Sequence, residues 1–300
     1  MSAPESRVDG AWIDPARGRT IPFRAYFPAA AGPAPTVVVS HATGGSREGY
    51  AYLGLAAAEH GYVSVHLQHP GSDVDCWRGK AGAALPAMRA AAADPRNASE
   101  RVADLIFALD RLAGGEAPFT GRVDAARIGV CGHSFGAATA LSAAGQRYLG
   151  ATGEEGGRAD PRIKAVLAMS SPRVWSERPE ELGRALTAVR VPCLHLTGTR
   201  DDSPLNDTRA AHRRVPFDLL RGADQVLVTF AGGDHMVFVG AKRLFGGEGH
   251  DARIHAAVRR AALAFWDAYL RDDEEARRWL LEGGLAEALG GEGRVEARAG

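Results

Sequence analysis

The sequence predicts an α/β fold: a mostly parallel central sheet with helices on both faces and an antiparallel N-terminal edge. Short apolar runs, rich in valine and isoleucine, recur at 35–41, 61–68, 127–132, 163–170, 191–198 and 225–232. Each run is typical of a buried parallel strand. Helical patterns lie between the runs, and this alternation favours a parallel sheet covered by helices on both sides.

The elements follow from local signals. Residues 8–30 contain two strand-like runs joined by a turn of proline, glycine and arginine, which predicts the antiparallel edge. A helix is expected over 99–114, because Ser99 with acidic residues close behind suits a helix start. An alanine-rich helix should follow Ser134, and an amphipathic helix is expected over 252–272.

Residues 1–282 are expected to form a single domain, because no linker or internal repeat divides them. The segments 70–98 and 171–190 interrupt the alternation where strands end. Ligands of open α/β sheets bind at that edge, so both segments are expected to be pocket walls, and surface helices are the alternative. Residues 283–300 are rich in glycine and polar side chains, which predicts a flexible tail.

Composition narrows the class of partner. Lysine plus arginine and aspartate plus glutamate both number 36, and no block of like charges suggests a nucleic-acid or membrane-surface partner. No apolar run approaches the roughly 20 residues that span a bilayer. The N-terminus lacks a secretory pattern, so a cytoplasmic protein with a small-molecule partner is expected. Nothing indicates the oligomeric state.

The motif Gly132-His133-Ser134-Phe135-Gly136 lies directly between a predicted strand and a predicted helix. A nucleophilic serine on a strained strand-to-helix turn needs glycines two residues away on either side, because side chains there would clash. Ser134 is therefore expected to be a nucleophile, and the alternative is an ordinary tight turn. The Phe135 N–H, at the helix start, is placed to donate to an oxyanion.

A serine nucleophile requires a histidine base and an acid, in the chain order Ser, Asp, His. Asp201 and Asp202 follow the second predicted strand after Ser134, and His235 follows the third. One-residue shifts reverse side-chain direction in extended chain, so only one aspartate can face the histidine, and the spacing leaves both open. The glycine-rich loop after the first parallel strand offers the Thr43 N–H as a second oxyanion donor.

Other patterns are interpreted as structural. His66 and His69 would face opposite sides of a strand, and Cys193 and His195 lack a third ligand, so no metal is expected. No glycine-rich phosphate loop is present, and no cofactor is expected.

Four segments together carry a family resemblance: SHATGGSREGYAYLGLAAAEHGYVSVHLQHPGSD, GVCGHSFGA, TGTRDDSP and GGDHMVF. On these the chain resembles the α/β-hydrolase superfamily, specifically the bacterial serine hydrolases similar to dienelactone hydrolases and platelet-activating-factor acetylhydrolases. The resemblance implies Ser134 as nucleophile, Asp201 as acid and His235 as base, with Thr43 and Phe135 as amide donors. Two features differ: Ala42 stands where such proteins usually have glycine, and dienelactone hydrolases proper use a cysteine nucleophile.

The expected function is hydrolysis of carboxylic esters with small or medium acyl chains through an acyl-enzyme. Lactonase, amidase or acyltransferase activity on the same three residues is the alternative, as is an inactive binding protein of the same fold. The large apolar side chains of the two wall segments are expected either to line the acyl pocket or to fix those segments to the domain; they are Trp77, Leu85, Met88 and Trp175.

Overall fold

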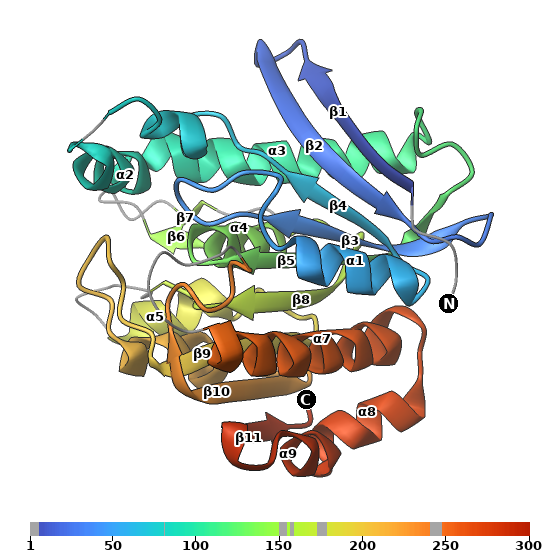
Figure 1. The fold of residues 1–300 in the computed structure, drawn as a ribbon, viewed down its shortest axis with the longest axis vertical. Helices are drawn as coiled ribbons and strands as arrows, with labels where there is room; N and C mark the ends of the chain where they lie inside the picture. Colours follow the sequence, from blue (N-terminus) through green and yellow to red (C-terminus); the bar gives the residue numbers. More distant parts are fainter. Residues whose placement is uncertain (1–5, 81, 150–154, 157–158, 173–178, 241–247) are drawn as a thin grey trace.

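The structure, a computed structural model, describes residues 6–80, 82–149, 155–156, 159–172, 179–240 and 248–300. Its main sheet has nine strands (Figure 1). In spatial order they are β1 (Ser6–Asp14), β2 (Arg19–Phe27), β4 (Val63–Leu67), β3 (Ala34–Ser40), β5 (Val123–His133), β8 (Ile163–Met169), β9 (Cys193–Arg200), β10 (Gln225–Asp234) and β11 (Gly293–Arg298). Strands β4, β3, β5, β8, β9 and β10 are parallel to one another.

Both edges of this sheet are antiparallel. β1 pairs with β2 and β2 with β4, as the turn at 14–19 predicted. At the other edge β11 pairs antiparallel with β10. A separate two-stranded sheet joins β6 (Tyr148–Leu149) to β7 (Glu155–Gly156). The predicted α/β class, with a mostly parallel sheet, helices on its faces and an antiparallel N-terminal edge, is confirmed.

Helices cover the sheet on two sides. The α-helices are α1 (Ala51–Glu59), α2 (Ala84–Ala93), α3 (Pro95–Ala113), α4 (Phe135–Ala143), α5 (Pro179–Leu186), α6 (Val215–Leu219), α7 (Glu248–Leu270), α8 (Glu274–Leu281) and α9 (Gly284–Leu289). Short 3-10 turns are η1 (Val74–Cys76), η2 (Ala210–Arg214) and η3 (Gly290–Glu292).

Two hydrophobic cores result from this layering. On one face, α3 and α4 bury leucine and alanine side chains against the sheet, together with Phe119. On the other, α1 and α7 pack against the valine-rich strands (Figure 1). Trp266 and Phe265 of α7 are fully buried there. Strand β3 is buried along its whole length, which explains its unbroken apolar run.

Two expectations about element ends differ from the structure. Helix α3 begins at Pro95, because Asp94 accepts a hydrogen bond from the Arg96 N–H and proline suits the first helical position. Ser99, the expected start, lies one turn inside, and its hydroxyl donates to the Pro95 and Arg96 carbonyls.

The C-terminal residues 283–300 were expected to be a flexible tail, and this expectation is wrong. They form α9, η3 and β11, and Leu285 and Leu289 are buried beside α7 and α8. The two leucines are four residues apart and so share one helix face, a signal that the surrounding glycines obscured.

Candidate active site

Ser134 lies at the turn between β5 and α4, with φ 54° and ψ −117°. A positive φ is uncommon for a residue with a side chain and stores strain. A Cβ on Gly132 would meet the backbone of Gly136 and lie 2.7 Å from the Ala137 nitrogen, while one on Gly136 would overlap the Ser40 carbonyl. Both glycines are therefore required for the tight approach of helix, strand and neighbouring loop at this turn.

Three side chains expected from the sequence meet at the carboxyl ends of the strands. His235 follows β10, and its Nε2 lies 3.1 Å from the Ser134 Oγ. Asp201 follows β9, and its Oδ1 lies 2.7 Å from the His235 Nδ1. Both distances are within hydrogen-bonding range. A carboxylate is an acceptor, so Asp201 favours the tautomer with the imidazole proton on Nδ1, which leaves Nε2 free to accept the serine proton.

The structure distinguishes the two adjacent aspartates. Asp201 is fully buried, and its second oxygen accepts a hydrogen bond from the Thr197 hydroxyl at 2.8 Å. The Asp202 side chain is about half exposed and instead binds the Arg209 guanidinium and the Ala210 N–H. These hydrogen bonds hold the pKa of Asp202 below its ordinary value. Only Asp201 contacts the histidine.

A cavity of about 460 Å³ opens beside the Ser134 hydroxyl. Its wall is apolar, and none of the described residues that line it carries a permanent charge. The larger lining side chains are Tyr50, Trp77, Leu85, Met88, His133, Leu205, Met236 and Val239. Such a cavity suits an uncharged substrate group.

Three of the four large side chains expected in the pocket wall line the cavity. Trp77, Leu85 and Met88, from segment 70–98, line the cavity. Trp77 also donates from Nε1 to the Gly44 carbonyl at 2.9 Å, so it fixes the glycine-rich loop as well. Trp175 lies outside the described residues, and the described part of 171–190 contributes no lining residue.

Both expected amide donors border this site. Thr43 lines the cavity, and Phe135 is the first residue of α4, directly after Ser134. Within the described part of the chain, no hydrogen bond engages either N–H. Ala42 sits in the loop without a positive φ, and its N–H donates to the Tyr50 hydroxyl at 3.3 Å. The extra Cβ of Ala42 is thus compatible with the loop conformation.

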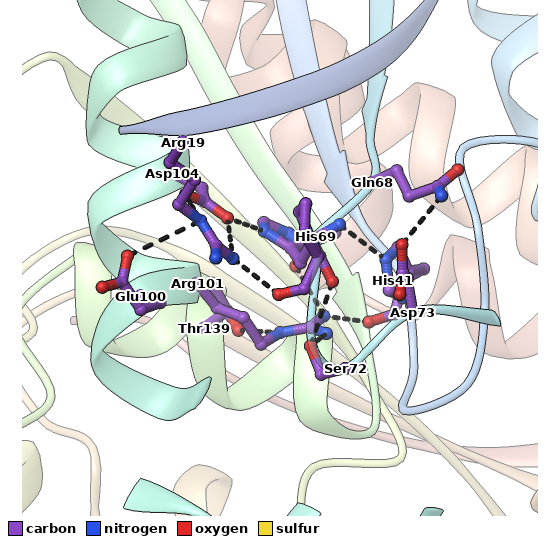
Figure 2. A network of polar contacts seen from close by, with 12 residues as sticks. Arg19, His41, Gln68, His69, Ser72, Asp73, Glu100, Arg101, Asp104 and Thr139 are labelled. Carbon is purple, nitrogen blue, oxygen red and sulfur yellow. Dashed lines mark hydrogen bonds and ion pairs between the residues drawn. The ribbon is translucent and has the colours of Figure 1, made fainter. Parts of the chain in front are cut away.

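A buried arginine that sequence reasoning missed joins this loop to helix α4 (Figure 2). Arg101 of α3 is fully buried, and its guanidinium donates to the His41 carbonyl, to the Ser40 hydroxyl at 3.1 Å and to the Ser72 hydroxyl at 2.9 Å. Its Nε donates to the Thr139 hydroxyl of α4 at 3.1 Å. The guanidinium also lies 4.7 Å from the centre of the Phe135 ring. Arg101 therefore contacts both chain segments that carry the candidate amide donors.

Asp104 and His69 complete this buried network. The Asp104 carboxylate binds the His69 Nδ1 at 3.0 Å and the Arg19 guanidinium at 2.7 and 2.9 Å. Burial alone would raise the pKa of Asp104, but the hydrogen bonds from His69 and Arg19 outweigh it and hold that pKa well below the ordinary range. Burial lowers the pKa of His69 to about 4, and the Arg101 charge acts in the same direction.

Neutral histidines then fix the loop through defined tautomers. The His69 Nε2 lies 2.9 Å from the Ser40 hydroxyl, which can donate to it because Nδ1 faces the Asp104 carboxylate. The main-chain N–H of His69 donates to the His41 Nε2. The His41 Nδ1 faces the Ala42 carbonyl at 2.7 Å. Burial lowers the pKa of His41 well below its ordinary value, so it too is neutral. His41 thus hydrogen-bonds to the main chain on both sides of its ring.

The remaining histidine and cysteine patterns are structural. His66 is buried and bonds to the Gly49 carbonyl and the Ser64 hydroxyl. His195 bonds to Gln225, and Cys193 to the Val191 carbonyl. In the described ranges no cluster of three potential metal ligands occurs, and no helix there is long and apolar enough to span a membrane.

Comparison with known proteins does not assign the chain to a family. No protein-family model matches it, and no curated protein matches it at a significant level.

Proposed function

We propose that the chain is a serine hydrolase of the α/β-hydrolase superfamily that cleaves carboxylic esters with small or medium apolar acyl groups. The observation that carries the proposal is the continuous contact from Ser134 Oγ through His235 to Asp201, at 3.1 and 2.7 Å, beside an apolar cavity. The strained turn at Ser134 and the chain order Ser, Asp, His support the same superfamily.

The reaction divides into two acyl transfers. The Ser134 oxygen attacks the ester carbonyl carbon while its proton passes to the His235 Nε2, and Asp201 stabilises the imidazolium through Nδ1. The Thr43 and Phe135 amides donate to the tetrahedral oxyanion. Collapse breaks the bond to the leaving alcohol, which takes the proton from Nε2. Water then attacks the acyl-enzyme in the same way, releasing the carboxylic acid and restoring the serine.

The decisive experiment labels the protein with a fluorophosphonate and maps the modified residue by mass spectrometry, alongside hydrolysis of p-nitrophenyl esters of graded chain length. We expect labelling at Ser134, and a loss in kcat of about 10⁴-fold or more in Ser134→Ala with the fold retained. Labelling at another residue would move the nucleophile elsewhere.

Assays of the wild-type protein with other substrates distinguish the alternative functions. Turnover of lactones or amides in preference to esters would assign a lactonase or amidase, and transfer of the acyl group to an added alcohol in preference to water would assign an acyltransferase. A folded protein that neither reacts with the label nor turns over any of these substrates would be an inactive binding protein.

A further inference from the structure

Arg213 is a buried arginine that packs against the candidate catalytic residues. It lies on η2 and is only 2% exposed, which is unusual for arginine. Its Nη1 donates to the Ser170 and Ser171 carbonyls at 2.9 and 3.0 Å, and its Nε donates to the Asp201 carbonyl at 3.0 Å. Three main-chain acceptors thus fix the plane of the guanidinium where β8 and β9 end.

The fixed guanidinium faces the acid and the base at the same point. Its Nε lies 3.3 Å from the Asp201 Oδ1, and its Nη2 lies 3.1 Å from the His235 Nδ1. That Nδ1 is also 2.7 Å from the Asp201 Oδ1. An anion and a cation therefore both contact the same edge of the imidazole, on the side opposite Ser134.

The two neighbours have opposite effects on the protonated imidazole. The Asp201 carboxylate favours a proton on Nδ1, because it can accept only from a donor. The Arg213 guanidinium is a donor and a cation, so it disfavours that proton and disfavours the imidazolium still more. Burial lowers the pKa of Arg213 and the Asp201 charge opposes this. An arginine stays charged under these conditions.

Other described groups near the imidazole do not duplicate this effect. The ring of His133 lies 4.8 Å from that of His235, centre to centre, and burial keeps the pKa of His133 well below its ordinary value, so it is neutral. Asp202 turns away to Arg209, and Asp234 accepts a hydrogen bond from the Met236 N–H. Asp201 and Arg213 are the charged groups of the described chain that contact the His235 ring.

We propose that Arg213 is a positioning residue whose positive charge limits protonation of His235 and so extends the activity of the site to lower pH. The proposal rests on the proposed function, because it assigns to His235 the role of base. Removal of the charge should make the imidazole easier to protonate, and the acid limb of the pH profile should then move to higher pH.

The test compares Arg213→Gln with Arg213→Lys, and uses Arg214→Gln as the matched control. Arg214 is the next residue of η2, but it is partly exposed and pairs with Asp218 and Glu296. The readout is the rate of Ser134 labelling by a fluorophosphonate as a function of pH, which needs no knowledge of the substrate. The midpoint of the acid limb is compared between variants over the pH range in which circular dichroism shows each variant to be folded, because acid unfolding would also raise the midpoint.

We expect the midpoint to rise by at least about one pH unit in Arg213→Gln, and to stay near the wild-type value in Arg213→Lys and Arg214→Gln. If Arg213→Gln does not fold, Arg213→Met removes the same charge while keeping an apolar stem, and it should give the same shift. An unchanged or lowered midpoint in the uncharged variant would overturn the proposal, as would an equal rise in Arg213→Lys. Wild-type protein that is never labelled at Ser134 would instead refute the proposed function.

Discussion

Arg101→Met should slow catalysis although Arg101 does not line the cavity. The substitution removes the donors to Thr139, Ser72, Ser40 and the His41 carbonyl while keeping an apolar chain of similar length. A buried acceptor that loses its partner costs about 1–3 kcal/mol. Removal of the buried cation itself offsets part of the loss, so we expect the free energy of unfolding to fall by about 3–5 kcal/mol.

The catalytic effect of Arg101→Met follows from where the lost contacts lie. Ser40 and His41 lead into the loop that carries Thr43, and Thr139 lies on the helix that begins at Phe135. A displacement of about 1 Å in a positioned group can cost 10²-fold in rate. The oxyanion forms only in the transition state, so the loss should occur in kcat more than in KM.

The assay is steady-state hydrolysis of a p-nitrophenyl ester, run at a temperature where thermal unfolding shows the variant to be folded. The control is Arg96→Met on the same helix, since the Arg96 side chain is 87% exposed and, among the described residues, pairs with Asp94 alone. A folded Arg101→Met protein whose kcat stays within threefold of wild type would show that the loop keeps its position without this arginine.

Three further predictions concern other parts of the chain. Asp201→Asn should reduce kcat by about 10⁴-fold, since the amide no longer selects the tautomer with the proton on Nδ1. Asp202→Asn should leave kcat within a few-fold of wild type, and reversed effects of the two substitutions would assign the acid to Asp202. Met88→Ala should change the ratio of kcat/KM between acyl chains that differ by one methylene, which is worth about 0.8 kcal/mol in an apolar pocket, and an unchanged chain-length profile would remove Met88 from the acyl site. Burial lowers the pKa of His195 to about 4, below the value of about 6.5 in an unfolded chain, so the folded state binds fewer protons between these values and stability should fall as pH drops from about 6.5 to 4. In urea unfolding, the His195→Gln variant should lose less stability than wild type over that pH window. If the two proteins lose the same stability, His195 is not a source of the pH dependence.

Local signals made the main part of the site predictable from the sequence. The strand, the glycines and the helix around Ser134 are contiguous, and counting strands after it placed an aspartate and a histidine at the same sheet edge. The spacing could not choose between Asp201 and Asp202, because that choice depends on where β9 ends. In the structure Asp201 contacts His235, whereas Asp202 binds Arg209 and Ala210.

The supporting arginines could not be predicted in the same way. Arg101 lies 38 residues from Thr139 along the chain, and Arg213 lies 43 residues from Ser170, so no local pattern relates them. Arginine is usually exposed, and a sequence rich in arginine gives no sign of which side chains are buried. For the C-terminal residues, glycine content suggested mobility, whereas the pairing of β11 with β10 is a long-range contact that composition does not report.

The backbone conformation of Ser134 has a consequence for protein engineering. A residue with a side chain at φ 54° carries a strain of about 1–3 kcal/mol, and glycine would adopt the same conformation without it. Natural proteins commonly give up some stability for function at such positions. A directed-evolution campaign that selects only for heat resistance would therefore favour glycine at residue 134 and discard the proposed nucleophile. Selection for stability in this protein therefore has to be coupled to a screen for the proposed chemistry.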